Sequence, residues 1–567
     1  MSEKRLDLVF LWHMHQPDYR DHTTGEHVLP WVYLHAIKDY TDMADHLERH
    51  PGIRAVVNFV PVLLDQIEDY CAQVDSGNFR EPLLRLLAAP DLANISPADR
   101  RLLLEACFRS NHTTMLAPFP RYQRLHDLYE SLGREGENAL AYLSGDYFAD
   151  LVTWYHLAWT GETERRRQPL IAELMSKGEG YRHAERMALL KLIGTTLRGI
   201  VPRYRALQEQ GQIELSATPN THPLAPLLLD FNSARQSLSD APLPLATAYP
   251  GGRQRLVAHI EAAKESHAAR FGAAPTGMWP AEGAISTGVA QQLALHGVRW
   301  LASGEGVLRN SLHRHGSGGH RAAYRPWAMP DASGITMFFR DEHLSDLIGF
   351  EYARWHGRDA ARHFVGQLEA ILADSPQGET PVVSVILDGE NAWEHYPYNG
   401  FFFFEDLYGL LENHPQIRTT TYREILSRQG AAAPVAATLP SLVAGSWVYG
   451  TLSTWIGDAE KNHAWDLLCA AKQSYDLVQS SGRLTAEESV AAERQLSICE
   501  SSDWFWWFGD YNPAAAVASF DQLYRRNLAN LYQLLKLTPP SQLNIPISRG
   551  SISAEGGSMR RAQEQSS

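Results

Sequence analysis

The sequence predicts an α/β fold: a seven-stranded (β/α)7 incomplete TIM-like barrel with a helical insertion, followed by a C-terminal helical bundle. Short apolar segments alternate with longer segments of helical spacing, which is typical of a parallel sheet covered on both faces. Seven such apolar segments can be counted. Several end in polar or charged residues, and a barrel builds its site at those carboxyl ends. A sheet left open would produce a similar pattern.

Each expected strand is a short apolar segment that stops at a polar loop. In chain order the segments are LDLVFLW (6–12), RAVVNFV (54–60), IELSAT (213–218), TGMWP (276–280), VRWLAS (298–303), ITMFF (335–339) and VVSVIL (382–387). The first leads into HMHQ, the fourth into AEG and the last into DGEN. Potential site residues therefore follow several different strands.

Helical spacing dominates two other parts of the chain. Residues 61–210, between the second and third expected strands, form the predicted insertion in a catalytic barrel of residues 1–430. The uncharged, alanine- and proline-rich stretch QGAAAPVAATLP (429–440) predicts a domain boundary. We expect a helical bundle over 441–540 and a mobile tail over 541–567, which is polar and rich in glycine and serine.

Composition narrows the class of ligand. Asp and Glu number 65 against 51 Lys and Arg, which gives a formal charge of −14 and argues against nucleic acid or an anionic membrane as partner. The four cysteines show no CxxC spacing, so neither a zinc knuckle nor a disulfide framework is predicted. No segment resembles a signal peptide or a spanning helix, and we expect a cytoplasmic protein without cofactor or metal; the oligomeric state is open. The 15 tryptophans suit either sugar stacking or a large core.

Two acidic residues directly follow expected strands. Glu282 comes after Trp279 in TGMWPAEG, and Asp341 comes after Arg340 in MFFRDEHLSD. A first-turn glutamate favoured by the helix dipole is the simpler interpretation of Glu282. A helix start is the simpler interpretation near Asp341, but it suits Asp346 better, because at Asp341 the strand has hardly ended. Two carboxylates from different strands that face each other across a barrel mouth are what glycoside cleavage requires.

Histidine and aromatic residues accompany these acids. His13 and His15 lie on one face of the first strand end, where they could form half of a metal site completed by Asp388, or bind sugar hydroxyls. His222, in SATPNTHP, suits either a loop cap or a sugar contact. Tryptophans and aspartates, including Asp503, alternate in the C-terminal region, as core or as residues that fold over a substrate.

Five segments, in chain order, resemble the motifs of glycoside hydrolase family 57. They are HMHQP (13–17), GQIELSATPNTHP (211–223), MWPAEG (278–283), FFRDEHLSDLIGF (338–350) and LDGENAWE (387–394). Further matching segments, GSWVYGTLSTWIGDAEKNHAW and SSDWFWWFGDYN, extend the resemblance to about residue 512. The fourth and fifth motifs are most similar to the amylopullulanase and α-amylase branch.

The resemblance implies a retaining enzyme that acts on α-glucans such as glycogen, starch or maltodextrin. By motif position Glu282 would be the nucleophile and Asp341 the general acid/base, with Asp346 in reserve. We expect hydrolysis of α-1,4 bonds and leave α-1,6 cleavage open. The expected substrate-binding residues are His13, His15, Gln16, His222, Trp279, Arg340, Asp346, Asp388, Glu390, Trp393, Trp455, Asp503 and Trp504.

Three other functions remain open at this point. A 4-α-glucanotransferase or glucan branching enzyme would differ only in whether a sugar or water accepts the glycosyl group. A metal-dependent polysaccharide deacetylase would use His13, His15 and Asp388. A non-catalytic glucan-binding protein would keep the scaffold without turnover.

Overall fold

The computed structural model describes residues 4–134, 137–314, 321–429, 436–552 and 558–561. The seven predicted strands form a closed barrel, which confirms the predicted fold class. Around the ring the order is β1-β2-β3-β4-β5-β7-β8, and the β8–β1 and β7–β8 pairings close it. All seven pairings are parallel. The strands span Leu6–Met14 (β1), Ala55–Phe59 (β2), Ile213–Ala217 (β3), Gly277–Met278 (β4), Trp300–Gly304 (β5), Thr336–Arg340 (β7) and Val382–Asp388 (β8).

The barrel strands are apolar because both of their faces are covered. Every residue of β1 is buried. Phe10 and Trp12 pack toward the helices, whereas Val9 and Leu11 join residues of the other strands inside the barrel. Three short strands extend the sheet: β6 (Trp327–Ala328) pairs with β7 and with β10 (Ala437–Thr438), and β9 (Ile417–Thr419) pairs with β1.

Helices surround the barrel between its strands. Before β2 these are α1 (Trp31–His35) and α2 (Thr41–Arg49). After β3 they are α11 (Ala225–Leu229), α12 (Gly252–Phe271), α13 (Thr287–Leu295), α14 (Glu305–His313), α15 (Glu342–Asp346), α16 (Gly357–Asp374), α17 (Phe401–Glu412) and α18 (Tyr422–Ser427). No helix in the described ranges has the length and apolar character needed to cross a membrane.

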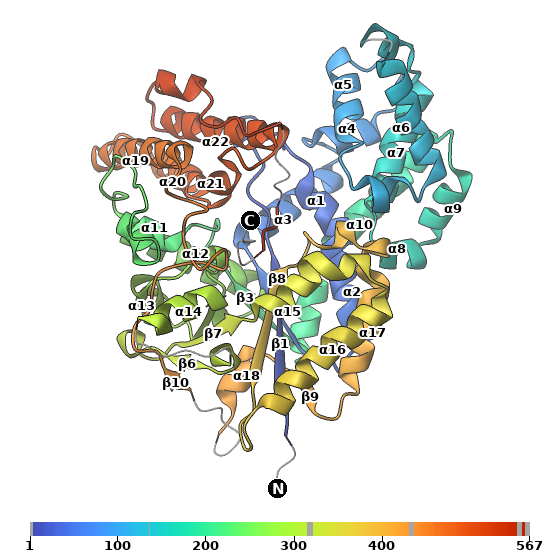
Figure 1. Ribbon diagram of the computed structural model, residues 1–567. Helices are drawn as coiled ribbons and strands as arrows, with labels where there is room; N and C mark the ends of the chain where they lie inside the picture. Colours follow the sequence, from blue (N-terminus) through green and yellow to red (C-terminus); the bar gives the residue numbers. More distant parts are fainter. Residues whose placement is uncertain (1–3, 135–136, 315–320, 430–435, 553–557, 562–567) are drawn as a thin grey trace.

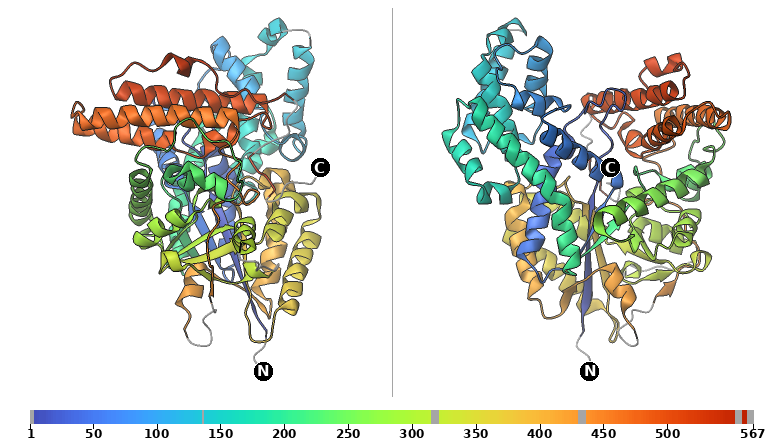
Figure 2. Two further views of the ribbon diagram at one scale, coloured as in Figure 1. Left: turned by 60° about the vertical axis from the view of Figure 1, so that its left-hand side comes forward. Right: turned by 180° about the vertical axis from the view of Figure 1, so that it is seen from behind.

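Two helical regions stand at the end of the barrel opposite the start of β1 (Figures 1 and 2). The first lies between β2 and β3 and contains α3 (Pro61–Ser76), α4 (Pro82–Ala88), α5 (Pro97–Ala106), α6 (Pro120–Gly133), α7 (Gly145–Ala158), α8 (Glu162–Arg167), α9 (Pro169–Lys177) and α10 (His183–Glu209). The second contains α19 (Ala459–Ser480), α20 (Ala486–Cys499), α21 (Asp503–Trp507) and α22 (Ala514–Leu534). Because the strands run toward this end, both regions stand over their carboxyl ends.

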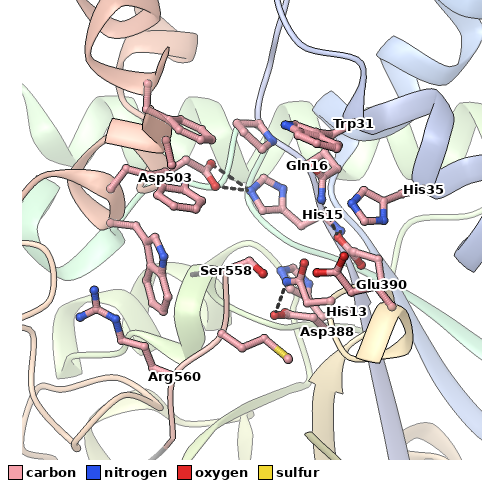
Figure 3. Close-up of a pocket in the computed structure, with 18 of the residues that line it drawn as sticks. His13, His15, Gln16, Trp31, His35, Asp388, Glu390, Asp503, Ser558 and Arg560 are labelled. Carbon is pink, nitrogen blue, oxygen red and sulfur yellow. Dashed lines mark hydrogen bonds and ion pairs between the residues drawn. The ribbon is translucent and has the colours of Figure 1, made fainter. Parts of the chain in front are cut away.

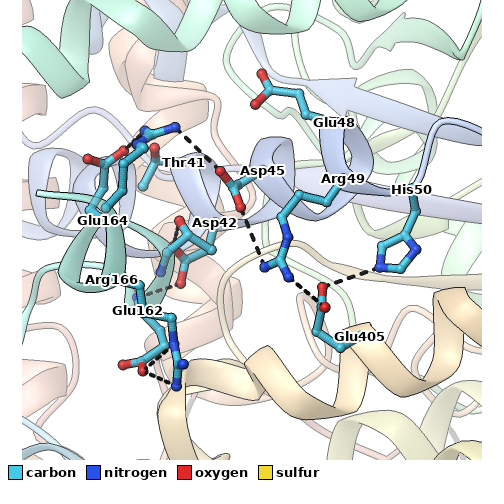
Figure 4. A network of polar contacts seen from close by, with 12 residues as sticks. Thr41, Asp42, Asp45, Glu48, Arg49, His50, Glu162, Glu164, Arg166 and Glu405 are labelled. Carbon is cyan, nitrogen blue, oxygen red and sulfur yellow. Dashed lines mark hydrogen bonds and ion pairs between the residues drawn. The ribbon is translucent and has the colours of Figure 1, made fainter.

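A polar network, buried at Asp42 and exposed at Arg49, joins the first helical region and the barrel helices (Figure 4). The Asp42 carboxylate accepts hydrogen bonds from the backbone N–H of Glu162 (2.8 Å) and from the Asn399 amide (2.9 Å). Arg49 of the same helix binds Glu405 of α17 at 2.6 Å. The start of α8 is therefore held by carboxylate capping as well as by apolar contact.

The end of the barrel and the start of the C-terminal helices are not separated by a free linker in the described residues. Strand β10, which lies within the predicted boundary stretch QGAAAPVAATLP, pairs with β6; residues 430–435 of that stretch lie outside the described ranges. Ile285 and Gly445 form a β-bridge next to the loop after β4. In the segment predicted as a tail, Ser551 bonds the Asn512 carbonyl at 2.9 Å, and Met559 packs on the core; residues 553–557 and 562–567 are outside the description.

Candidate active site

A cavity of about 710 Å³ lies at the carboxyl end of the barrel, within the usual size range of ligand sites. The barrel, the first helical region and the C-terminal helices all line it. Of the predicted site residues, those that line it are His13, His15, Gln16, His222, Glu282, Arg340, Asp388, Glu390 and Asp503 (Figure 3 labels six of them). The ends of five strands, β1, β3, β4, β7 and β8, bring the barrel residues of this set together, and α21 adds Asp503.

Glu282 lies in the loop after β4 with 8% of its surface exposed. The Trp447 indole N–H donates to its Oε2 (3.0 Å), and the Ser502 hydroxyl donates to its Oε1 (3.2 Å). No lysine or arginine among the described residues forms an ion pair with it. Burial, followed by the charges of Asp503 and Asp388, raises the pKa of Glu282 to about 8.

The backbone at the site is strained at two positions. Glu282 has φ 60° and His222 has φ 63°, both in the left-handed region that residues other than glycine seldom adopt. Each is held by a partner from the C-terminal region: the Trp447 N–H bonds the Glu282 carbonyl at 3.1 Å, and the Ser502 N–H bonds the His222 carbonyl at 2.8 Å. Such strain persists only where surrounding contacts fix it, so these segments hold the carboxylate in one position.

Asp388 is the last residue of β8 and lies in the same cavity. Strands β4 and β8 are on opposite sides of the seven-membered ring, so Glu282 and Asp388 approach the cavity from facing sides. The Asn391 amide donates to Asp388 Oδ2 at 2.8 Å. Burial raises the pKa of Asp388 to about 6, although the charges of His15 and Arg340 act in the opposite direction. The two carboxyl groups thus disfavour being ionised together.

Three histidines form a hydrogen-bonded cluster beside Glu282. His13 and His222 share a bond between their Nε2 atoms (3.1 Å), and their Nδ1 atoms bond Asn58 Oδ1 (2.7 Å) and Ser502 Oγ (2.8 Å) respectively. The His15 ring stacks on that of His222 with centroids 3.8 Å apart. Burial lowers the pKa of His13 to about 3 and that of His222 well below its usual value. Neutral imidazoles of this kind are suited to hydrogen bonding and to positioning.

The same cluster contains one potential metal group in the described chain. Ligand atoms of His15, His222 and Asp503 lie within 4.8 Å of one another. However, both nitrogens of His222 and both of His13 already have hydrogen-bond partners, and stacked rings do not direct their in-plane lone pairs at a common point. The donor arrangement fits a metal poorly, which weakens the deacetylase alternative.

Glu390 supports the loop after β1. Its Oε1 accepts from the His15 backbone N–H and from the Gln16 amide, each at 3.2 Å, and Gln16 in turn accepts from the Tyr19 hydroxyl at 2.8 Å. Burial, followed by the Asp388 charge, raises the pKa of Glu390 well above its usual value. The hydrogen bonds of Glu390 to the backbone and side chain of the loop after β1 make it a positioning group.

Arg340 connects both sides of the cavity. Its Nε donates to the Ile386 carbonyl (2.8 Å), two residues before Asp388, and its Nη2 donates to Asp346 (2.9 Å). Its guanidinium lies 5.7 Å from the Trp447 ring, which holds Glu282. Asp346, which was predicted to bind substrate and to be the reserve acid/base, does not line the cavity, and its carboxylate bonds Arg340.

Asp341 does not face Glu282 as the sequence predicted. It is the N-cap of α15: its Oδ1 accepts from the Leu344 N–H at 2.7 Å, and its Oδ2 accepts from the Tyr324 hydroxyl at 2.9 Å. It is absent from the described lining of the cavity. The helix-start interpretation therefore applies to Asp341, because the chain turns from β7 directly into α15.

Four predicted tryptophans, Trp279, Trp393, Trp455 and Trp504, are core residues with at most 1% of their surface exposed. Sequence reasoning missed Ser502, Trp506 and Trp507, which are in or beside the site. Asp503, Trp506 and Trp507 are spaced i, i+3, i+4 on α21 and all line the cavity. That helical spacing in SSDWFWWFGDYN was the available signal. No local spacing indicated that Trp447 bonds Glu282, because the two residues are 165 positions apart in the sequence.

The cavity continues toward the first helical region. Trp31 of α1, Trp159 after α7, and Arg109 and Asn111 after α5 line that side. Aromatic faces and hydrogen-bonding side chains thus extend beyond the carboxylate pair. This extended lining suits an elongated neutral ligand better than a compact one.

The family model described as Glycosyl hydrolase family 57 matches residues 9–436. Among solved structures, a branching enzyme from Thermococcus kodakaraensis is similar with a TM-score of 0.57 and 16% identity, over 94% of this chain and 90% of that one. An α-amylase from Thermotoga maritima gives a TM-score of 0.56 and 15% identity, over 94% and 93%. A branching enzyme from Pyrococcus horikoshii gives 0.55 and 17%, over 99% of both chains. At these identities the structures show the shared fold.

Proposed function

Because the chain belongs to glycosyl hydrolase family 57, we propose that it is a retaining enzyme of the α-amylase type that cleaves α-1,4-glucosidic bonds in α-glucans. The observation that carries this proposal is the facing pair Glu282 and Asp388 in one cavity. The net charge of −14 and the aromatic lining suit a neutral sugar chain. The similar structures, named as an α-amylase and branching enzymes, add support for α-glucans as the substrate class.

In this proposal Glu282 is the nucleophile. The indole N–H of Trp447 can only donate, so it favours the ionised carboxylate and fixes its orientation. With pKa values of about 8 for Glu282 and about 6 for Asp388, the pair holds one proton at neutral pH, and the reaction starts from the form in which Asp388 carries that proton and Glu282 is ionised. Positive charge that develops at the anomeric carbon in the transition state favours ionised Glu282 during the reaction.

Asp388 takes the role of general acid/base that the sequence assigned to Asp341. Asp388 protonates the leaving glycosidic oxygen while Glu282 Oε attacks the anomeric carbon, so the C–O bond to the leaving sugar breaks and a glycosyl ester forms. Asp388 then takes a proton from water, whose oxygen attacks the anomeric carbon. The ester bond breaks, and the Glu282 carboxylate and protonated Asp388 are restored.

Three isosteric variants test these roles with maltooligosaccharides and glycogen. Glu282→Gln and Asp388→Asn should each lower kcat/KM by roughly 10²–10⁴-fold or more. The matched variant Asp341→Asn should cost less than about 10-fold, since its loss affects only a helix cap. A large loss in Asp341→Asn with an active Asp388→Asn would reverse the assignment.

Product analysis addresses the acceptor. With maltopentaose, accumulation of reducing ends supports hydrolysis, whereas longer or branched products indicate transfer to a sugar. A glycosyl adduct on Glu282, trapped with a fluorinated sugar and located by mass spectrometry, would identify the nucleophile. An adduct on Asp388 instead would exchange the two roles.

A further inference from the structure

The segment Ser558–Arg561, near the end of the described chain, enters the same cavity as the carboxylate pair. Ser558, Met559 and Arg560 line it together with His15, Asp388 and Asp503 (Figure 3). These residues are remote from the catalytic groups in sequence. No step of the proposed reaction uses them.

Arg560 covers aromatic faces that line or adjoin the cavity. Its guanidinium lies 3.8 Å from the centroid of the Tyr511 ring and 4.8 Å from that of Trp506. With the segment in place, only 7% of the Trp506 surface is exposed. The electron-rich face of an indole attracts a cation, and it attracts the C–H groups on the face of a sugar ring in the same way. Arg560 and a glucose unit would therefore compete for one surface.

The ion pair that attaches the segment is exposed, although Met559 also packs on the core. Arg561 pairs with Glu351, and these side chains are 36% and 38% exposed, which makes the pair a small contribution. Arg561 also lies over Phe350, with 5.1 Å between the guanidinium and the ring centroid. Both Phe350 and its neighbour Glu351 belong to the π-helical turn Leu347–Glu351 that follows α15.

The position of Arg560 is also electrostatically unfavourable. Its Nη2 is buried and has no hydrogen-bond partner among the described residues. Its charge acts against that of Lys461, which is buried and donates to the Phe505 and Phe508 carbonyls (2.6 and 2.7 Å). No carboxylate in the described ranges forms an ion pair with Arg560. The stabilising cation–π contacts and the cost of the unpaired N–H oppose each other, so Arg560 itself holds the Trp506 face only weakly.

We propose that Arg560 determines the chain-length specificity of this cavity, with the segment Ser558–Arg561 as a displaceable cover on the Trp506 face. Short α-1,4-glucans bind without moving the segment. Longer chains reach the Trp506 face only after they displace it. This inference rests on the proposed function, because it takes an α-glucan as the ligand.

The test compares KM values for maltotriose and maltoheptaose. If the covered state dominates in the free protein, Arg560→Ala should lower the KM for maltoheptaose by about five- to ten-fold, while that for maltotriose moves less than about two-fold. A chain that ends at Ile552, which keeps the bond between Ser551 and Asn512, should behave in the same way. The matched control is Arg549→Ala, which changes an exposed arginine that lies outside Ser558–Arg561.

The opposite outcomes are equally informative. An unchanged maltoheptaose KM in both variants overturns the inference, and a raised KM shows that the segment is part of the binding wall. Calorimetric titration of maltoheptaose into Glu282→Gln, with and without Arg560→Ala, separates binding from turnover. If the wild type is inactive on α-glucans but the double variant binds several-fold more tightly, the proposed function fails and this inference stands.

Discussion

Glu282 and Glu500 are both buried glutamates, but their surroundings give them opposite properties. Glu500 binds Arg255 at 2.9 Å and His259 at 2.7 Å, and Tyr249 donates to it at 2.5 Å. Burial acts to raise the pKa of Glu500, but the Arg255 charge, together with the hydrogen bonds and charge of His259 and Arg255, outweighs it and lowers that pKa to about 2. Glu282 accepts two hydrogen bonds but has no arginine or lysine pair in the described chain, so burial and nearby carboxylates raise its pKa.

The two glutamates therefore differ in role: Glu500 attaches the C-terminal helices to the barrel, whereas Glu282 is placed to react. Glu500 ends α20 and fixes the corner that also contains Ser502 and Asp503, which reach into the cavity. A fully paired carboxylate is stable and unreactive there. Glu282 has no such positive partner in the described chain, so its charged form is costly to bury. It is therefore suited to change its ionisation during a reaction.

The largest expected effect concerns Glu500 and the free energy of unfolding. Glu500→Gln leaves the buried Arg255 with only the exposed Glu493 as a carboxylate partner and should reduce the free energy of unfolding by about 3–5 kcal/mol. Glu493→Gln, which removes the exposed partner of the same arginine, should cost less than about 1 kcal/mol. Thermal unfolding followed by circular dichroism provides the measurement. Equal thermal midpoints for the two variants would contradict the role of Glu500 as the main partner of Arg255.

Glu282 should show the opposite behaviour. Its raised pKa contributes stability that is fully present below the unfolded-state value near 4.5 and is lost as pH rises through about 8. Glu282→Gln cannot ionise at this position. Its free energy of unfolding should match that of the wild type at pH 5 and exceed it by about 3 kcal/mol at pH 8. This difference is smaller than the full pKa shift implies, because Asp388 shares the titration.

The measurement is the thermal midpoint of both proteins at pH 5, 6.5 and 8. The exposed Glu265→Gln serves as control and should show no such divergence. For Glu500 the pH dependence is reversed, because its stabilisation is present above pH 4.5 and is lost as pH falls through about 2. A wild type that gains stability relative to Glu282→Gln between pH 5 and 8 would disprove the electrostatic account of Glu282.

The comparison also explains what the sequence could predict. The barrel strands were readable because strands buried on both faces must be apolar along their length, as β1 and β8 are. Glu282 was readable because it follows such a strand in a recognisable motif. These signals are local, and they identified the correct family.

The partner of Glu282 was not readable in the same way. Asp341 and Asp388 both stand at strand ends, and only the turn that follows decides where each side chain points. Asp341 meets the first turn of α15 and caps it, whereas Asp388 remains within β8 and faces the cavity. Trp447 and Ser502 reach Glu282 from 165 and 220 residues away, and no local pattern encodes such contacts.

Trp447→Phe tests the donor that partly compensates Glu282. It removes one hydrogen bond to the carboxylate and should reduce kcat/KM by about 10- to 100-fold. The N–H lowers the pKa of Glu282, on which the proton shared with Asp388 mainly resides. Loss of the N–H should therefore move the basic limb of the pH–rate profile, where the pair loses that proton, above its expected wild-type position near pH 8. Trp355→Phe, an exposed tryptophan, is the control. A basic limb that does not move would show that the indole acts only by packing.

The smallest expected effect distinguishes two roles for Arg340. Lysine at this position keeps the charge but loses the planar donors that bond the Ile386 carbonyl and Asp346 together. If Arg340 positions Asp388, Arg340→Lys should lower kcat by roughly 3- to 10-fold with little change in KM, because ground-state binding is retained. If Arg340 binds substrate, as the sequence predicted, KM should rise and kcat should hold.

Asp346→Asn separates these alternatives further, since Asp346 lies outside the cavity lining and contacts Arg340. A positioning role requires Asp346→Asn to reproduce part of the kcat loss of Arg340→Lys, whereas a substrate-binding role does not. The double variant should then lose less than the product of the two single effects, because both changes loosen the same guanidinium. Independent, multiplying losses would place Arg340 and Asp346 in separate functions.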